Sequence, residues 1–271
     1  MLIRDCLITL RIAMKASAPW IFLWLIVALI AVVLMGMQFS ARQPATVALD
    51  IGVSMMRLSI PILVALLVQE LINREFERKL YLTTLSYPRP RTAWLFGRVL
   101  GISLIALVML VVMSLILAGL VIFAQSGYTQ ATPVSLAWPY VVTLMSIALD
   151  GLVVISIATL LAVSATTPSL VLIGTIGFIL IARSYTPIIA LLQSNPNTVS
   201  EYVDPHLYQD SLGLIAFLVP DLGRLDVRMV ALYDKMQFLP ADWPLLVVST
   251  FTYAIAILAL SAWVLNKREL S

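Results

Sequence analysis

Asp150 is the residue whose position most strongly indicates chemistry, because it lies inside an apolar run, residues 139–163. A carboxylate within a membrane span is costly and tends to face a cavity or a partner. Two interpretations stay open: a side chain that lines a polar pathway or binds substrate, and a structural hydrogen bond or a protonated acid. Arg57 and Arg183 lie nearer the ends of apolar runs, so we expect their side chains to extend to the membrane surface.

Other patterns give little support for catalysis. His206, the one histidine, follows Glu201 and Asp204 in a polar segment, but one imidazole with scattered carboxylates is common in loops and we do not assign a metal site. The chain has no GxxxxGK[ST] phosphate loop, and it has no HExxH, GxSxG or CxxC motif. We therefore predict no catalytic residue, no metal ligand and no bound cofactor in this chain.

The stretch 73–101 concentrates charge between two apolar runs. Counted with Glu70 just before it, the stretch holds three acidic and six basic side chains: Glu70, Glu75 and Glu77, and Arg74, Arg78, Lys79, Arg89, Arg91 and Arg98. A solvated loop that fixes membrane topology would explain the basic residues, but acidic residues contribute little to topology. The mixed signs therefore favour a surface that docks a protein.

Local spacing supports a short helix followed by a rigid bend. Glu75 and Lys79 form a favourable i,i+4 pair, and Phe76 and Leu80 share an apolar strip. The sequence SYPRPR then ends the helix, because proline lacks the backbone N–H and extends the residue before it. Gly97 and Gly101 follow, four residues apart, and this spacing lets a neighbouring helix approach closely.

The elements that must position these residues are membrane-spanning helices. Of the 271 residues, 61% are hydrophobic and 11% are charged, with a mean hydropathy of +1.02. Runs of about 20 apolar residues cross a bilayer as helices, because lipid cannot hydrogen-bond the backbone. We predict an all-α membrane protein with six spans, at residues 18–38, 52–70, 97–124, 139–163, 169–192 and 243–265.

Basic residues set the predicted orientation. With six spans both termini share one side, and the segments on that side carry eleven of the 17 basic side chains: Arg4, Arg11, Lys15, Arg74, Arg78, Lys79, Arg89, Arg91, Arg98, Lys267 and Arg268. Both termini are therefore expected in the cytoplasm. Residues 1–17 place apolar residues at helical spacing, which predicts an interfacial amphipathic helix, although a basic flank that only fixes topology explains them equally well. The six spans then occupy 18–271.

The outer segment between the fifth and sixth spans covers about residues 193–242. Its apolar stretch 212–219 is too short to cross, and Pro220 ends it, which favours a re-entrant or interface-buried helix. After it, we expect a short amphipathic helix with one apolar face, formed by Leu225, Met229, Leu232, Tyr233 and Met236.

The 70–101 region resembles the permease subunits of type-2 ABC transporters, the six-span class that includes bacterial exporters and the nitrous-oxide-reductase maturation permease. That family has a glutamate at the end of span two, a charged coupling helix, a serine–proline–arginine segment and a glycine-rich start of span three. The matching parts here are Glu70, residues 74–85, TTLSYPRPR and GRVLG. The segment LVPDLGRLD, with Pro220, Asp221 and Arg224, is similar to the family's outer re-entrant region.

The resemblance implies a permease without its own motor. Two permease copies, or this chain and a paralogue, would pair in the inner membrane of a bacterium, and a cytosolic ABC ATPase that binds Mg-ATP would dock on a coupling helix at about 74–86. The coupling residues would be Glu70, Arg74, Glu75, Phe76, Glu77, Arg78, Leu80 and Arg91. The other partner is the lipid bilayer, and no nucleic acid is expected.

Two other classes of function stay open. An ion-coupled secondary transporter or a channel would use Asp150 and work without ATP. A membrane assembly subunit would bind partners without transport.

Overall fold

The computed structural model describes residues 2–40, 42–73, 90–126, 134–165, 167–194 and 220–267. Side chains are described over the same ranges except at residues 2, 3 and 185–194. Within this part of the chain 89% of residues are helical and none lies in a strand. The predicted all-α class is confirmed for these residues.

Among the described residues, five helices are long and apolar enough to cross a membrane, which confirms a helical, membrane-type protein. They are α2 (Ala18–Phe39), α3 (Pro44–Val68) with its π-helical extension η1 (Gln69–Asn73), α6 (Arg91–Ser126), α7 (Trp138–Ser164) and α12 (Trp243–Lys267). A sixth helix, α8 (Pro168–Ser194), occupies the place of the predicted fifth span. Its part with described side chains, Pro168–Ser184, is apolar but shorter than the other five.

Helix α3 begins earlier than the sequence predicted. The expected span was 52–70, whereas the helix starts at Pro44, whose fixed φ angle suits a first turn. The added turns include Asp50, a residue that the apolar pattern excluded from a span. Because the helix starts at Pro44, Arg57 lies near its middle and not near its end as predicted.

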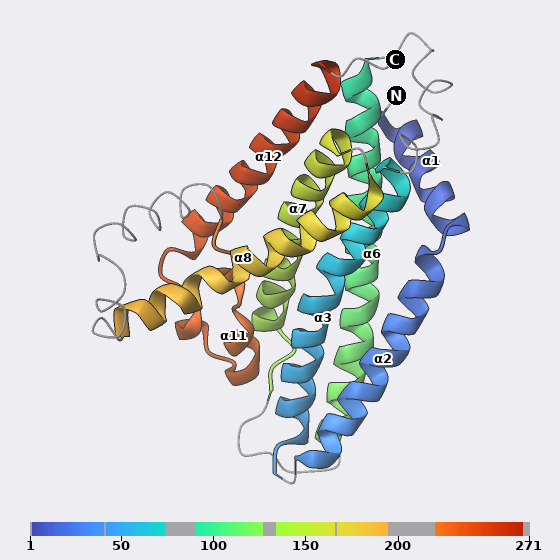
Figure 1. Cartoon of the computed structure of the whole chain (residues 1–271). Helices are drawn as coiled ribbons and strands as arrows, with labels where there is room; N and C mark the ends of the chain where they lie inside the picture. Colours follow the sequence, from blue (N-terminus) through green and yellow to red (C-terminus); the bar gives the residue numbers. More distant parts are fainter. Residues whose placement is uncertain are drawn as a thin grey trace.

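The long helices form one bundle whose core lies along α3, α6 and α7 (Figure 1). Helix α12 packs mainly on α7, and α2 packs on α3. Helix α8 crosses α7 and α3 obliquely, and the start of α1 and the end of α12 lie at the same end of the bundle (Figure 1). The arrangement leaves large apolar side chains exposed on α2 and α12, such as Trp20, Trp24 and Leu245, each about 70% exposed. A face of this kind suits contact with lipid.

Helix α1 (Leu2–Lys15) packs across the start of α6. Its small buried residues Asp5, Thr9 and Ala13 line the contact, while Leu7 and Met14 point away and are exposed. A methyl group added at Gly97 would lie 2.6 Å from Asp5 Cβ. Glycine at this position is therefore what lets the two helices approach, and the larger apolar side chains of α1 are left for the surface.

Between α8 and α12 the structure describes residues 220–242, which fold back against the bundle in three short helices. These are η2 (Leu222–Leu225), α11 (Arg228–Tyr233) and η3 (Met236–Phe238). The expected single amphipathic face is wrong in detail, because the helix is interrupted. The structure buries Val230, Ala231 and Leu232 against the bundle, whereas Met229, Tyr233 and Met236 stay about half exposed. We call residues 220–242 the return segment.

Candidate functional site

A network of paired charges joins the return segment to the middle of the bundle. Asp150, halfway along α7, is 1% exposed and pairs with Arg183 of α8. Arg57 of α3 pairs with Asp226 of the return segment. The expectation that both arginines extend to the membrane surface is therefore wrong, because each is held by a carboxylate from another element.

Proline 61 explains why Arg183 can bind α3 as well as α7. Proline has no backbone N–H, so in a helix it leaves the carbonyl four residues earlier without its usual donor. That carbonyl belongs to Arg57, and it accepts a hydrogen bond from Arg183 Nη2 at 2.7 Å. The Arg183 guanidinium group thereby connects the buried Asp150 carboxylate on α7 to the Arg57 backbone carbonyl on α3.

The return segment contributes the remaining contacts. Arg57 Nη2 donates to the backbone oxygen of Leu222 at 2.8 Å, which fixes the start of η2 against α3. Arg228 Nη1 donates to Ser54 Oγ at 2.8 Å and lies 3.3 Å from Asp50 Oδ1. Arg228 Nε is also 3.7 Å from Asp226 Oδ2, so Asp226 lies between two arginines. Four elements, α3, α7, α8 and the return segment, are joined by these pairs.

A cavity of about 440 Å³ adjoins this network. Its wall contains the guanidinium groups of Arg57, Arg183 and Arg228, and a single carboxylate, that of Asp226. The other residues of the wall are Val53, Ser54, Leu58 and Gly223. We call this space the arginine cavity.

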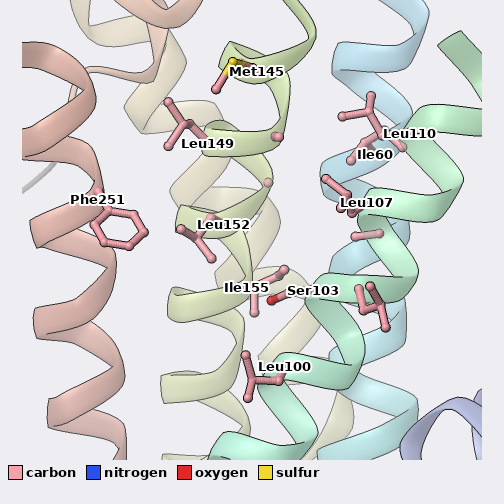
Figure 2. A pocket seen from close by; sticks show the side chains of 14 residues that line it. Ile60, Leu100, Ser103, Leu107, Leu110, Met145, Leu149, Leu152, Ile155 and Phe251 are labelled. Atoms are coloured by element: carbon pink, nitrogen blue, oxygen red, sulfur yellow. The ribbon is translucent and has the colours of Figure 1, made fainter. Parts of the chain in front are cut away.

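A second hollow, of about 490 Å³, opens on another face of the bundle and is almost wholly apolar (Figure 2). Figure 2 shows side chains of α6 and α7 facing each other across it, with Phe251 of α12 on one side and Ile60 of α3 near α6. Ser103 is the one hydroxyl-bearing residue of its wall. A space with such walls suits hydrocarbon and offers no charged group to a ligand.

The predicted coupling residues divide into two groups. The whole expected coupling helix, 74–86, lies outside the described residues, and with it six of the predicted coupling residues: Arg74, Glu75, Phe76, Glu77, Arg78 and Leu80. His206 and the apolar stretch 212–219 also lie outside the described residues. Arg91 is the first residue of α6.

Glu70 lies in η1, at the last described turn before residue 74. Its Oε2 accepts a hydrogen bond from Ser17 Oγ at 2.8 Å, and its Oε1 accepts one from the Ser17 backbone N–H at 3.4 Å. Ser17 directly precedes α2 and is the second of the two residues between α1 and α2. Glu70 therefore ties the joint of the first two helices to the end of α3.

The glycine pair of α6 contacts α1. A methyl group at Gly97 would clash with Asp5, and one at Gly101 would lie 2.6 Å from Thr9 Cβ. Between these positions, buried Arg98 donates from Nη1 to Thr9 Oγ1 at 3.3 Å. The sequence indicated a close approach here without indicating the partner helix.

The predicted outer residues lie at the start of the return segment. Pro220 precedes η2, and Asp221 caps it by accepting from the Gly223 backbone N–H at 3.0 Å. Arg224 is exposed and its Nη2 donates to both carboxylate oxygens of Asp242 at 2.7 Å. The hydrogen bond from Arg224 lowers the pKa of Asp242. This pair closes the return segment on itself at the surface.

Sequence reasoning found Asp150 but not its partners. Arg57, Arg183, Asp226 and Arg228 are distant in sequence, and only the spacing of Arg57 and Pro61, four residues apart in one helix, offered a local signal. Within the described residues no group of three or more metal-binding side chains is found. No model of a known protein family matches the chain, and a search of curated proteins finds no match either.

Proposed function

We propose that the chain is the membrane-spanning permease subunit of an ATP-driven transporter, an exporter whose ATPase is a separate cytosolic protein. The ATPase docks on the charged loop at about 74–86 and moves the helices attached to it. A second permease copy or a paralogue completes the pathway, and α8 serves as the sixth span. The membrane is the inner membrane of a bacterium, with both termini in the cytoplasm.

The observation that carries this proposal is the pair of hydrogen bonds between Glu70 and Ser17. The charged loop follows η1 directly in the sequence, so a force on the loop would act first on Glu70 and α3. Through Ser17 the same force acts on the joint between α1 and α2. A loop that only connected two spans would need no such link, whereas a motor-driven loop needs a rigid attachment to several helices.

Helix α3 extends this attachment to the middle of the bundle. From η1 it continues to Arg57, which pairs with Asp226 and donates to Leu222 of the return segment. Ion pairs between elements have discrete alternative arrangements, which suits a two-state switch. Movement of α3 would therefore open or close the contact between the bundle and the return segment, which acts as a re-entrant cover of the pathway.

An ion-coupled mechanism has less support, because Asp150 is held by Arg183. A carboxylate that carries protons or sodium must be free to bind and release them, whereas the Asp150 carboxylate is already bound to a guanidinium group. A purely structural assembly subunit would not need a charged cavity in the middle of the bundle, because charged groups within a membrane are costly.

Affinity purification of the full chain from its native membrane tests the docking. We expect a P-loop ATPase to copurify with the chain. Reversal of two loop charges, Glu75→Lys with Glu77→Lys, should remove most of that ATPase, because charge reversal across an interface is strongly repulsive.

The matched control is Lys235→Glu, a charge reversal at an exposed position of the return segment. It should leave the amount of bound ATPase unchanged. Equal recovery of ATPase with the loop variant and with wild type would contradict docking on the loop. Absence of any ATPase from the wild-type preparation would contradict the proposed function as a whole.

A further inference from the structure

The arginine cavity has more hydrogen-bond donors than its own carboxylates use. A guanidinium group carries five N–H donors in a planar fork. Arg183 bonds only through Nη2 within the described part of the chain, and its Nε is buried without a partner. Within the described residues, Arg57 makes its contacts through its two Nη atoms, and Arg228 makes its contacts through Nη1 and Nε.

The charge of the cavity wall is unbalanced although the surrounding network is balanced. Among the described residues of the wall, three arginines and Asp226 carry a net charge of +2. Asp150 and Asp50, which pair with Arg183 and Arg228, are not part of the wall. These two carboxylates offset the buried positive charge of the network, while the space itself is lined by cationic groups.

Asp226 shows which kind of group these arginines bind. Its Oδ2 is paired with Arg57 and lies 3.7 Å from Arg228 Nε, so one oxyanion already lies between two guanidinium groups. Phosphate offers more acceptor oxygens than a carboxylate and a charge of about −1.5 to −2, which matches the +2 wall. A volume of about 440 Å³ is sufficient for such a group.

We propose that the arginine cavity binds a phosphate group, contributed either by a lipid head group or by a water-soluble phosphate. Arg183 Nη1 and Arg228 Nη2 supply N–H donors that no contact within the described residues uses, and Arg57 adds a positive charge from α3. The proposal concerns binding alone, so it does not rest on the docking of an ATPase.

The test measures binding to the purified full chain in nanodiscs of neutral phosphatidylcholine. One arm titrates inorganic phosphate, and the other arm incorporates phosphatidic acid into the nanodiscs, with thermal stabilisation of the protein as the readout in both. Binding of inorganic phosphate identifies a soluble source, and stabilisation by phosphatidic acid alone identifies a lipid source. Both results support the site if they depend on the cavity arginines.

Two variants establish that dependence. Arg228→Gln removes one half-exposed donor, and Asp150→Asn with Arg183→Gln removes a buried pair without leaving a lone charge. Each should weaken the apparent affinity about tenfold or more, because a charge-assisted hydrogen bond is lost. Arg224→Gln is the matched control: it removes a positive charge from the same segment, outside the cavity wall, and should bind as wild type does.

The proposal is overturned if wild type responds to neither phosphate source. It is equally overturned if Arg228→Gln and Arg224→Gln bind with the same affinity as wild type, since the response would then arise at the general surface. If the double variant does not fold, the comparison of Arg228→Gln with Arg224→Gln decides the matter alone.

Discussion

At the residue scale, the pairing of Asp150 with Arg183 determines how each buried charge affects the stability of the protein. Asp150 is almost wholly buried, so its charge is tolerated only because Arg183 neutralises it. Arg183 also satisfies the carbonyl that Pro61 leaves open on α3. The Asp150 carboxylate on α7 and the Arg57 carbonyl on α3 therefore both depend on one guanidinium group of α8.

Loss of one partner of this pair should destabilise the protein more than loss of both. Asp150→Asn leaves Arg183 without its counter-charge and should cost about 3–5 kcal/mol, whereas Asp150→Asn with Arg183→Gln should recover most of that loss. The measurement is the free energy of unfolding in detergent micelles, in a double-mutant cycle.

An exposed pair serves as the control for this cycle. Neutralising Arg224 and Asp242, singly and together, should change the stability little, because solvent screens them. Additive effects of the Asp150 and Arg183 substitutions would contradict the pairing on which the site is built.

At the element scale, the packing of α1 on α6 depends on glycine. Gly97 and Gly101 allow the buried stripe of α1 to touch α6, so the apolar side chains of α1 are left exposed in the manner of an interfacial helix. Together with the hydrogen bond from Ser17 to Glu70, this contact connects α1, α2 and the end of α3, the helix that precedes the charged loop in the sequence.

Adding a methyl group on this face of α6 should displace α1. Gly97→Ala and Gly101→Ala each place Cβ 2.6 Å from an α1 side chain and should cost about 1–3 kcal/mol through overpacking. Cys6, the single cysteine of the chain, is half-buried on α1 and reports the displacement directly. Its reaction with a maleimide should become several-fold faster in both variants.

Gly119→Ala is the control on the same helix, because nothing lies within 4 Å of the added methyl group. Its Cys6 reactivity should equal that of wild type. Unchanged reactivity in all three variants would mean that α1 does not rest on these glycines.

At the scale of the whole molecule, the helices are predictable from sequence because apolar length is a local property. Five runs were found as long helices for this reason, with ends shifted by a few residues. The early start of α3 was missed because Asp50 is polar. Asp50 pairs with Arg228, which is too distant in the sequence for the pair to be predicted. The arginine cavity was missed likewise, since its wall combines α3, α8 and the return segment.

Asp150 was recognised because one charge in an apolar run is itself a signal. Its partner could not be predicted, because Ser, Thr and Arg side chains on several helices were equally available to it. The coupling residues 74–80 stay a prediction from sequence, supported by the position of Glu70 at the last turn before them.

The most direct test of the proposed coupling is whether ATP binding by the proposed partner ATPase changes the arginine cavity. In a Cys6→Ser background, Ser54→Cys places the only thiol in the cavity wall. We predict that its labelling rate in the purified complex differs several-fold between nucleotide-free and ATP-bound states, and that Glu75→Lys with Glu77→Lys abolishes the difference. A labelling rate that is the same with and without ATP, in a complex that hydrolyses ATP, would contradict the coupling of loop, α3 and cavity.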